Sequence, residues 1–133
     1  MNREQLKQLF LDLTKYTYIY GYEDEVYEKY LPKNLKKDSF GNYYIKIGES
    51  KTIFTCHLDT VGNQKLKVNH EVFEKDGHEF VKTDGNTILG GDDKAGVVIL
   101  LNMIEHNVPG LYLFLIGEEK GTVGSNLLVR NMF

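Results

Sequence analysis

The sequence has very little cysteine, and this scarcity limits the kinds of site that it can build. Cys56 is the single cysteine among 133 residues, so the chain can form no internal disulfide and no metal site based on cysteine pairs. A lone thiol fits a reducing compartment, and we expect the protein to be cytoplasmic. Any metal ion must then be bound by histidine, aspartate and glutamate side chains.

The chain also lacks the charge and hydropathy patterns of several protein classes. Its net charge is −3 and it has no long basic run, which argues against nucleic acid as a partner. It has no apolar run of transmembrane length, and its start, MNREQLKQLF, lacks the basic-then-apolar design of a secretion signal. We therefore expect a single domain over residues 1–133, with no nucleic-acid or membrane partner.

Hydrophobic periodicity and turn residues predict an alternation of helices and strands. The predicted helices cover about residues 3–19, 26–31, 91–106 and 121–132. The predicted strands cover two pieces of residues 38–48 around Gly41-Asn42, residues 52–56, a hairpin over 66–83 that turns at Asp76-Gly77, and the apolar run at 110–119. This order predicts a three-layer αβα domain.

Pairs of polar residues follow the apolar strands or open the helix after them. These pairs are His57 with Asp59, Asp92 with Asp93, and Glu118 with Glu119. Residues two apart on a strand point the same way, so the histidine and aspartate of the first pair would share one face. In open α/β sheets, ligands bind at the carboxyl ends of the strands, where all three pairs are expected.

Each pair also has a simpler explanation when it is taken alone. Asp92 and Asp93 stand where a helix should begin, and aspartate is a favoured N-cap residue. Glu118 and Glu119 could form a solvated turn, and His57 could simply close a strand. The occurrence of all three pairs together favours a metal site over these simpler explanations, because imidazole and carboxylate groups together suit zinc, manganese or cobalt.

Three motifs then resemble a known family. HLDTV at 57–61, LGGDDKAG at 89–96 and IGEEKGTVGS at 116–125 are similar to the catalytic core of the zinc-dependent exopeptidases with co-catalytic metals. The similarity is greatest to the branch that contains tripeptidase T and related aminopeptidases and amidohydrolases. It extends from about residue 4 to about residue 128. The resemblance implies the αβα phosphorylase/hydrolase-like fold of that family, truncated on its C-terminal side.

The resemblance also implies a role for each motif residue. His57 would bind one metal ion, and Asp59 would hydrogen-bond the His57 imidazole and orient it. Asp92 would bridge two metal ions, and Glu119 would bind the second. Glu118 would be the general base that takes a proton from the attacking water and passes it to the leaving amine. The reaction would be hydrolysis of a peptide or related amide bond near a chain end, with zinc as the first choice of metal and cobalt or manganese as alternatives.

The sequence departs from the family pattern after Glu119. The family uses a further aspartate on the next strand and a histidine near the end of a longer chain, whereas residues 120–133 contain no Asp, Glu or His. Asp93 is expected to act as a cap or a supporting group. We do not expect His70, His78 or His106 to supply the missing ligands. Metal binding should therefore be weak or partial, and the resemblance implies no other cofactor.

Two functions from different classes remain open at this stage. The chain is either the N-terminal half of an exopeptidase site, completed by another polypeptide or a second copy, or a catalytically inactive peptidase-like module that binds other molecules. The intact site residues favour the enzyme, whose substrate would be a short peptide. We also expect the apolar strand at 111–116 to be an exposed sheet edge, unless the 66–83 hairpin shields it, and such an edge would favour association.

Overall fold

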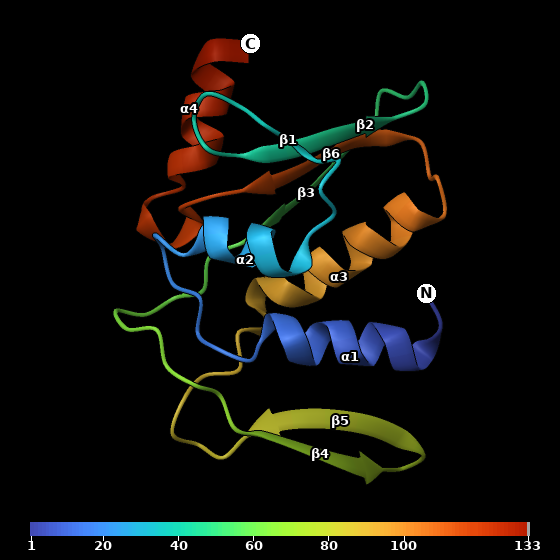
Figure 1. Cartoon of the computed structure of the whole chain (residues 1–133), viewed down its shortest axis with the longest axis vertical. Helices are drawn as coiled ribbons and strands as arrows, with labels where there is room; N and C mark the ends of the chain where they lie inside the picture. Colours follow the sequence, from blue (N-terminus) through green and yellow to red (C-terminus); the bar gives the residue numbers. More distant parts are fainter. Residues whose placement is uncertain (133) are drawn as a thin grey trace.

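The computed structural model describes residues 1–132, with side chains up to residue 128 (Figure 1). Its elements in chain order are α1 (Arg3–Leu13), α2 (Glu23–Tyr30), β1 (Lys36–Lys37), β2 (Tyr43–Ile47), β3 (Ile53–His57), β4 (His70–Lys75), β5 (His78–Thr83), α3 (Gly91–Glu105), β6 (Gly110–Leu115), the short 3₁₀ helix η1 (Glu118–Lys120) and α4 (Val123–Met132). Within this part of the chain, no helix has both the length and the apolar character needed to cross a membrane.

The main sheet has four strands in the order β1-β2-β6-β3, so β6 lies in its interior. β6 runs antiparallel to β2 and parallel to β3. Its apolar sequence suits this place, because a strand inside a covered sheet contacts other residues on both faces. Tyr112 and Phe114, which point to one face, are fully buried, and Leu113, which points to the other, is buried too. The expectation that residues 111–116 form an exposed edge is therefore wrong, and the edges of this sheet are the two-residue strand β1 and the longer strand β3.

Helices lie on both sides of this sheet in Figure 1. α2 and α3 lie on one side, whereas α4, in red, lies on the other side beside one end of the sheet. α1 packs against α3 and α2, and the β4–β5 hairpin lies beyond α1. The structure thus confirms a mixed α/β fold.

Helix α1 is shorter than its periodicity predicts, since it ends at Leu13 rather than near residue 19. The Thr14 hydroxyl donates to the carbonyl of Phe10 at 2.8 Å and closes the last turn. The Thr17 amide then donates to the Leu66 carbonyl at 2.8 Å. This hydrogen bond to Leu66 holds the chain in an extended form. Local residue spacing cannot predict a partner so far away in the sequence.

The strand piece predicted before Gly41-Asn42, at residues 38–40, is part of the turn instead. Asp38 Oδ1 accepts hydrogen bonds from the amides of Phe40 and Asn42, at 2.8 and 2.9 Å. An aspartate that binds amides further along its own chain favours a turn over a strand. The strand pieces on either side are Lys36–Lys37 and Tyr43–Ile47.

The β4–β5 hairpin turns at Asp76 and Gly77, as predicted. Both residues have positive φ, 53° and 76°, which is the backbone that a two-residue hairpin turn requires. The hairpin forms a sheet of its own, and Lys7 of α1 forms an ion pair with its Glu79 at 3.0 Å. It therefore covers no edge of the main sheet.

Helix α3 links the core to the polar end of the sheet. Its apolar residues, including the fully buried Val97, pack against β3 as part of the main core. Its first residues are not yet helical, because Asp92 and Asp93 have ψ angles of 100° and 33°. The peptide bond between these two residues is cis. Asp92 and Asp93 therefore precede the regular part of the helix.

Candidate metal centre

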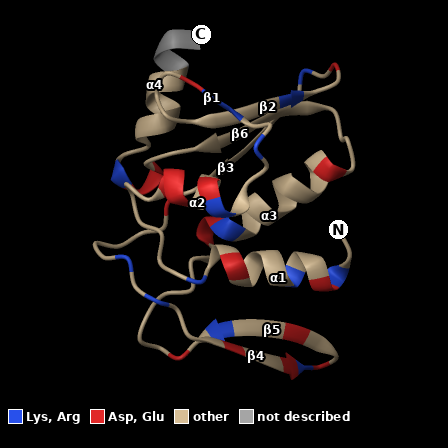
Figure 2. Cartoon of the chain, in the orientation of Figure 1, with Lys and Arg blue, Asp and Glu red and all other residues tan. Residues whose placement is uncertain are grey.

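The three polar pairs converge at one end of the sheet. His57 is the last residue of β3, and it pairs in register with Leu115 at the end of the parallel strand β6. The chain after β6 then forms η1, so η1 begins beside His57. One ligand atom each from His57, Asp92 and Glu119 lie within 4.8 Å of one another. Figure 2 shows in red the acidic residues that gather at the starts of α2 and α3 and on η1.

The His57 ring is fixed through both of its nitrogens. Nδ1 lies 2.8 Å from the backbone oxygen of Asp59, and a carbonyl can only accept, so Nδ1 carries a proton and donates it there. Nε2 lies 3.0 Å from Asp92 Oδ1. Burial of the ring lowers its pKa, but the hydrogen bonds with Asp59 and Asp92 outweigh this effect and raise the pKa to about 9. A ring held in this way points Nε2 toward the carboxylates.

Asp59 is fully buried and binds the chain that carries the two glutamates. Its Oδ1 accepts from the Glu118 amide and its Oδ2 from the Glu119 amide, each at 3.0 Å. Its Oδ1 also lies 3.4 Å from His57 Nδ1, further than the Asp59 backbone oxygen does. Although burial raises the Asp59 pKa, the bonds from His57 and the two amides hold it below its usual value. Asp59 therefore contacts the histidine ring and the backbone amides of both glutamates.

The two glutamates face the same site from η1. Glu118 Oε2 lies 3.7 Å from His57 Nε2, and the Glu118 side chain is 40% exposed. Desolvation and the neighbouring charge of Glu118 raise the pKa of the Glu119 carboxyl. A carboxylate with a raised pKa and an acidic neighbour is a group that a cation would stabilise.

The two aspartates at the start of α3 differ in exposure and in the groups that they contact. The Asp92 side chain is 86% exposed and reaches His57. Asp93 instead turns into the protein, where its Oδ2 accepts from the His57 amide at 3.2 Å and its Oδ1 from the Gly96 amide at 3.2 Å. Asp93 thus joins the first turn of α3 to the end of β3 and acts as a cap as well as a support.

Sequence reasoning missed Lys94, which is fully buried beneath the site. Its Nζ donates to the Leu58 carbonyl at 2.7 Å and to the Thr60 hydroxyl at 3.1 Å. Burial lowers its pKa to about 8, against the attraction of Asp59 and other nearby groups. The signal in the sequence was a lysine inside a strongly apolar helix, directly after two aspartates.

The other histidines lie elsewhere in the described structure. His70 Nε2 lies 2.8 Å from the Thr14 hydroxyl, and His106 Nδ1 lies 2.8 Å from the Asn102 carbonyl. His78 is exposed on the hairpin. Among the described residues, one group of histidine, cysteine, aspartate or glutamate side chains could hold an ion, and it is the group of His57, Asp92 and Glu119.

This donor set fits a divalent metal ion. One imidazole and two carboxylates are ligands that zinc, cobalt and manganese accept, and a catalytic zinc normally has three protein ligands plus an open position. Nε2 of His57 is directed at the carboxylates, and a metal ion there would take the place of its proton.

Comparisons with known proteins were made by sequence and by fold. No family model matches the chain. An uncharacterized protein of Bacillus subtilis, YqjE, is 42% identical over 88 residues, which cover 59% of this chain and 22% of that protein. Peptidase T of Clostridium botulinum is 46% identical over 51 residues, which cover 37% of this chain and 12% of that enzyme. The chain therefore matches only a minor part of the length of these relatives.

Two solved structures of the TET1 peptidase share the fold. That of the Pyrococcus horikoshii enzyme, which can assemble into a tetrahedron or a large octahedral shell, has a TM-score of 0.62 at 18% identity and covers 95% of this chain. A dodecamer of PhTET1 gives a TM-score of 0.59 at 18% identity. The chain covers 65% of each of these structures. The expected resemblance to peptidases is confirmed in this general form, by partial sequence similarity and by fold.

Proposed function

We propose that this chain forms the N-terminal half of a metal-dependent exopeptidase site, which hydrolyses peptide or related amide bonds near a chain end. The convergence of His57, Asp92 and Glu119 carries this proposal. Partial similarity to peptidase T and the fold shared with a TET1 peptidase support peptide-bond hydrolysis. We also propose that the mixed sheet and its helices are part of a three-layer αβα core of the zinc exopeptidase type.

The site residues divide into ligands and a base. His57, Asp92 and Glu119 would hold zinc, or cobalt or manganese, with Asp92 placed to bridge to a second ion. The bound metal would polarise the scissile carbonyl and lower the pKa of the attacking water. Glu118 would take a proton from that water and deliver it to the leaving amine. The Glu118 carboxylate supports this role by its position, since its Oε2 lies 3.7 Å from Nε2 of the proposed ligand His57.

With two ions that share Asp92, each ion would have only two ligands from this chain, so the site would need further ligands. The outer edge of β3 is where they could be delivered. β3 ends in His57, so a strand added in parallel along this edge would end beside the same histidine. Ile53 at the start of β3 is 47% exposed, which leaves apolar surface for such a partner. We propose that a complementing polypeptide, or another copy of the chain, pairs there.

Paired substitutions of the two glutamates test this assignment. Glu118→Gln should leave zinc affinity close to that of the wild type, because the base is not a ligand. Glu119→Gln should weaken zinc binding, because an amide oxygen is a poorer ligand than a carboxylate. Zinc titration and hydrolysis of tripeptides are measured on both variants, and the same change in metal affinity for both would refute the division of roles. An active wild type whose activity survives Glu118→Gln would refute it too.

A non-catalytic binding module is the alternative outcome of the same measurements. It predicts a folded chain that binds short peptides without metal and without turnover.

A further inference from the structure

Side chains bind every backbone amide of the turn that carries the two glutamates. We call residues 116–119 the glutamate turn. Its hydrogen bonds are Ile116 N to Asn42 Oδ1 at 3.1 Å, Gly117 N to Glu23 Oε2 at 2.9 Å, Glu118 N to Asp59 Oδ1 at 3.0 Å, and Glu119 N to Asp59 Oδ2 at 3.0 Å. All three acceptors are buried, with exposed fractions of 1%, 5% and 0% for Asn42, Glu23 and Asp59. The turn thus has a fixed scaffold of four consecutive bonds.

Glu23 is the member of this scaffold whose position is least expected. It is the first residue of α2, where a glutamate normally lies in solvent and interacts with the helix dipole. Here the side chain is buried, and both oxygens bind backbone amides: Oε1 accepts from Gly21 at 2.7 Å and Oε2 from Gly117 at 2.9 Å. Burying a carboxylate is unfavourable unless strong hydrogen bonds compensate it. Such an arrangement joins two segments that are 94 residues apart.

The bond to Gly117 acts at the point where the chain turns from β6 into η1. Gly117 has φ of 61°, in the left-handed region that favours glycine. A Cβ atom at this position would lie 3.0 Å from Tyr20 and 3.0 Å from Val123. The conformation of Gly117 sets the direction in which Glu118 and Glu119 leave the sheet. Glu23 holds that residue by its amide.

We propose that Glu23 is a positioning residue of the metal centre, which aims Glu118 and Glu119 at His57 by clamping the glutamate turn to the start of α2. This inference rests on the proposed function, because it takes Glu119 as a ligand. The side-chain hydrogen bonds of Glu23 go to the amides of Gly21 and Gly117 and not to the side chains of the proposed ligands. It acts through the backbone, as supporting groups around metal sites do when they orient the ligands.

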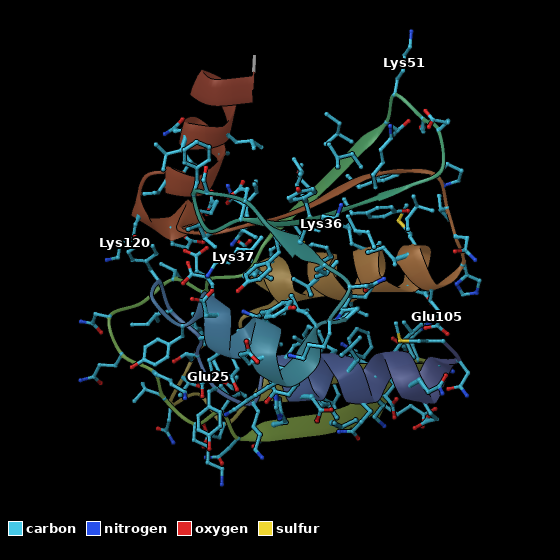
Figure 3. All side chains as sticks on the ribbon, turned by 45° about the horizontal axis from the view of Figure 1, so that its top comes forward. Glu25, Lys36, Lys37, Lys51, Glu105 and Lys120 are labelled. Atoms are coloured by element: carbon cyan, nitrogen blue, oxygen red, sulfur yellow. The ribbon has the colours of Figure 1, made fainter. Side chains whose placement is uncertain are left out.

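The test compares Glu23→Gln with Glu25→Gln. Glutamine keeps the shape of Glu23 but has one acceptor oxygen, so its NH₂ group must face the amide of either Gly21 or Gly117. Glu25 is on the same helix (Figure 3), and it binds Lys65 and Lys29 instead of the turn. Both variants lose a buried or half-buried carboxylate of α2, so a general loss of stability affects both.

Two readouts distinguish positioning from support of the fold alone. In a cobalt titration followed by absorbance, E23Q should bind Co²⁺ about tenfold more weakly than the wild type and shift its absorption bands. E25Q should match the wild type in both respects. In amide hydrogen exchange by NMR, E23Q should speed exchange at Glu118 and Glu119, whose amides bind Asp59, as well as at Gly117. Faster exchange confined to Gly21 and Gly117, or unchanged cobalt binding by folded E23Q, would overturn the inference.

The exchange measurement separates this inference from the proposed function. A wild-type chain that binds no cobalt would refute the metal site, whereas exchange at Glu118 and Glu119 would still decide whether Glu23 holds the turn. If E23Q does not fold, Glu23→Asp takes its place, since the shorter side chain keeps the charge but cannot reach both amides. Faster amide exchange at Gly117, Glu118 and Glu119 is then expected of Glu23→Asp, and unchanged exchange at Glu118 and Glu119 would contradict the positioning role of Glu23.

Discussion

At the residue scale, the site depends on carboxylates that bind backbone amides as much as on those that face the ion. Asp59 was expected to orient His57, yet its carboxylate is nearest to the amides of Glu118 and Glu119, and its backbone oxygen makes the shorter contact to the ring. The spacing of two residues predicts that His57 and Asp59 lie together. It carries no information about the turn 60 residues away, which only the folded chain brings to Asp59.

Replacement of Asp59 by asparagine should damage the site and the fold together. Asparagine has one acceptor oxygen, so its NH₂ group must face the amide of Glu118 or Glu119. The loss of one buried bond should lower the free energy of unfolding by about 1–3 kcal/mol. Zinc affinity should fall about tenfold, because the turn that carries Glu119 loosens. Urea unfolding and zinc titration measure the two effects.

Asp84→Asn is the matched control for this substitution. Asp84 also accepts from a backbone amide, that of Asn86 at 2.9 Å, but it is exposed and its side chain binds Asn69 and Asn86 instead of a residue of the site. It should change the free energy of unfolding much less and leave zinc binding unaltered. Equal losses of unfolding free energy and zinc affinity in the two variants would show that the buried position of Asp59 adds nothing to either.

At the element scale, the sequence predicted helices and strands well where local pattern decides them. The hairpin turn at Asp76-Gly77 and the strand at 110–115 follow from turn chemistry and apolar runs. The end of α1 and the turn at Asp38 did not follow, because Leu66 and Asn42 hold those segments by specific hydrogen bonds. Periodicity records which face of an element is apolar and says nothing of such partners.

The link between β6 and η1 should be sensitive to any side chain at Gly117. Gly117→Ala must adopt positive φ and also press its Cβ against Tyr20 and Val123. Together these effects should lower the free energy of unfolding by about 1–3 kcal/mol. Gly121→Ala is the control, because Gly121 has φ of 82° with nothing within 4 Å of its Cβ position. Thermal unfolding should show a clearly larger loss for G117A, and equal losses would mean that the close packing around Gly117 does not matter.

The contact between α2 and the loop before β4 should depend on pH through Glu25. Hydrogen bonds from Lys65 and from Lys29 lower the pKa of Glu25 below its usual 4.5. The carboxylate therefore stabilises the folded state at pH values above 4.5, and this contribution is lost as the pH falls through the lower, folded-state pKa. The difference in unfolding free energy between wild type and E25Q should be about 1 kcal/mol near pH 7 and should shrink as the pH falls below 4.5. A difference that stays constant with pH would contradict this role.

At the scale of the whole molecule, the order of the strands determines which of them lie at the edges of the sheet, and the sequence alone does not give this order. The apolar run at 111–116 predicts a strand, which was expected at an exposed edge, but its neighbours depend on how β2 and β3 pair around it. One edge of the sheet consequently belongs to β3, whose carboxyl end is part of the candidate metal centre. The similar TET1 peptidase forms oligomeric shells, and the present chain covers 65% of its length.

The free edge of β3 should make the chain associate. Sedimentation velocity over a concentration series should show oligomers or a reversible increase in mass. Ile53→Lys should shift the equilibrium toward monomer, because a lysine on an edge strand opposes pairing with another chain. Lys51→Glu is the control, since this side chain lies on the loop before β3 and points away from the body of the protein (Figure 3). A wild type that stays monomeric at high concentration would contradict the proposed pairing.

A cobalt titration of the wild-type chain and of His57→Ala tests the central claim most directly. The account predicts that the wild type binds Co²⁺ weakly but measurably, with absorption bands of an ion bound by nitrogen and oxygen ligands. It predicts that His57→Ala loses these bands while its far-ultraviolet circular dichroism remains that of a folded chain. Absence of binding by the wild type, or identical titrations for the two proteins, would contradict a metal centre built on His57, Asp92 and Glu119.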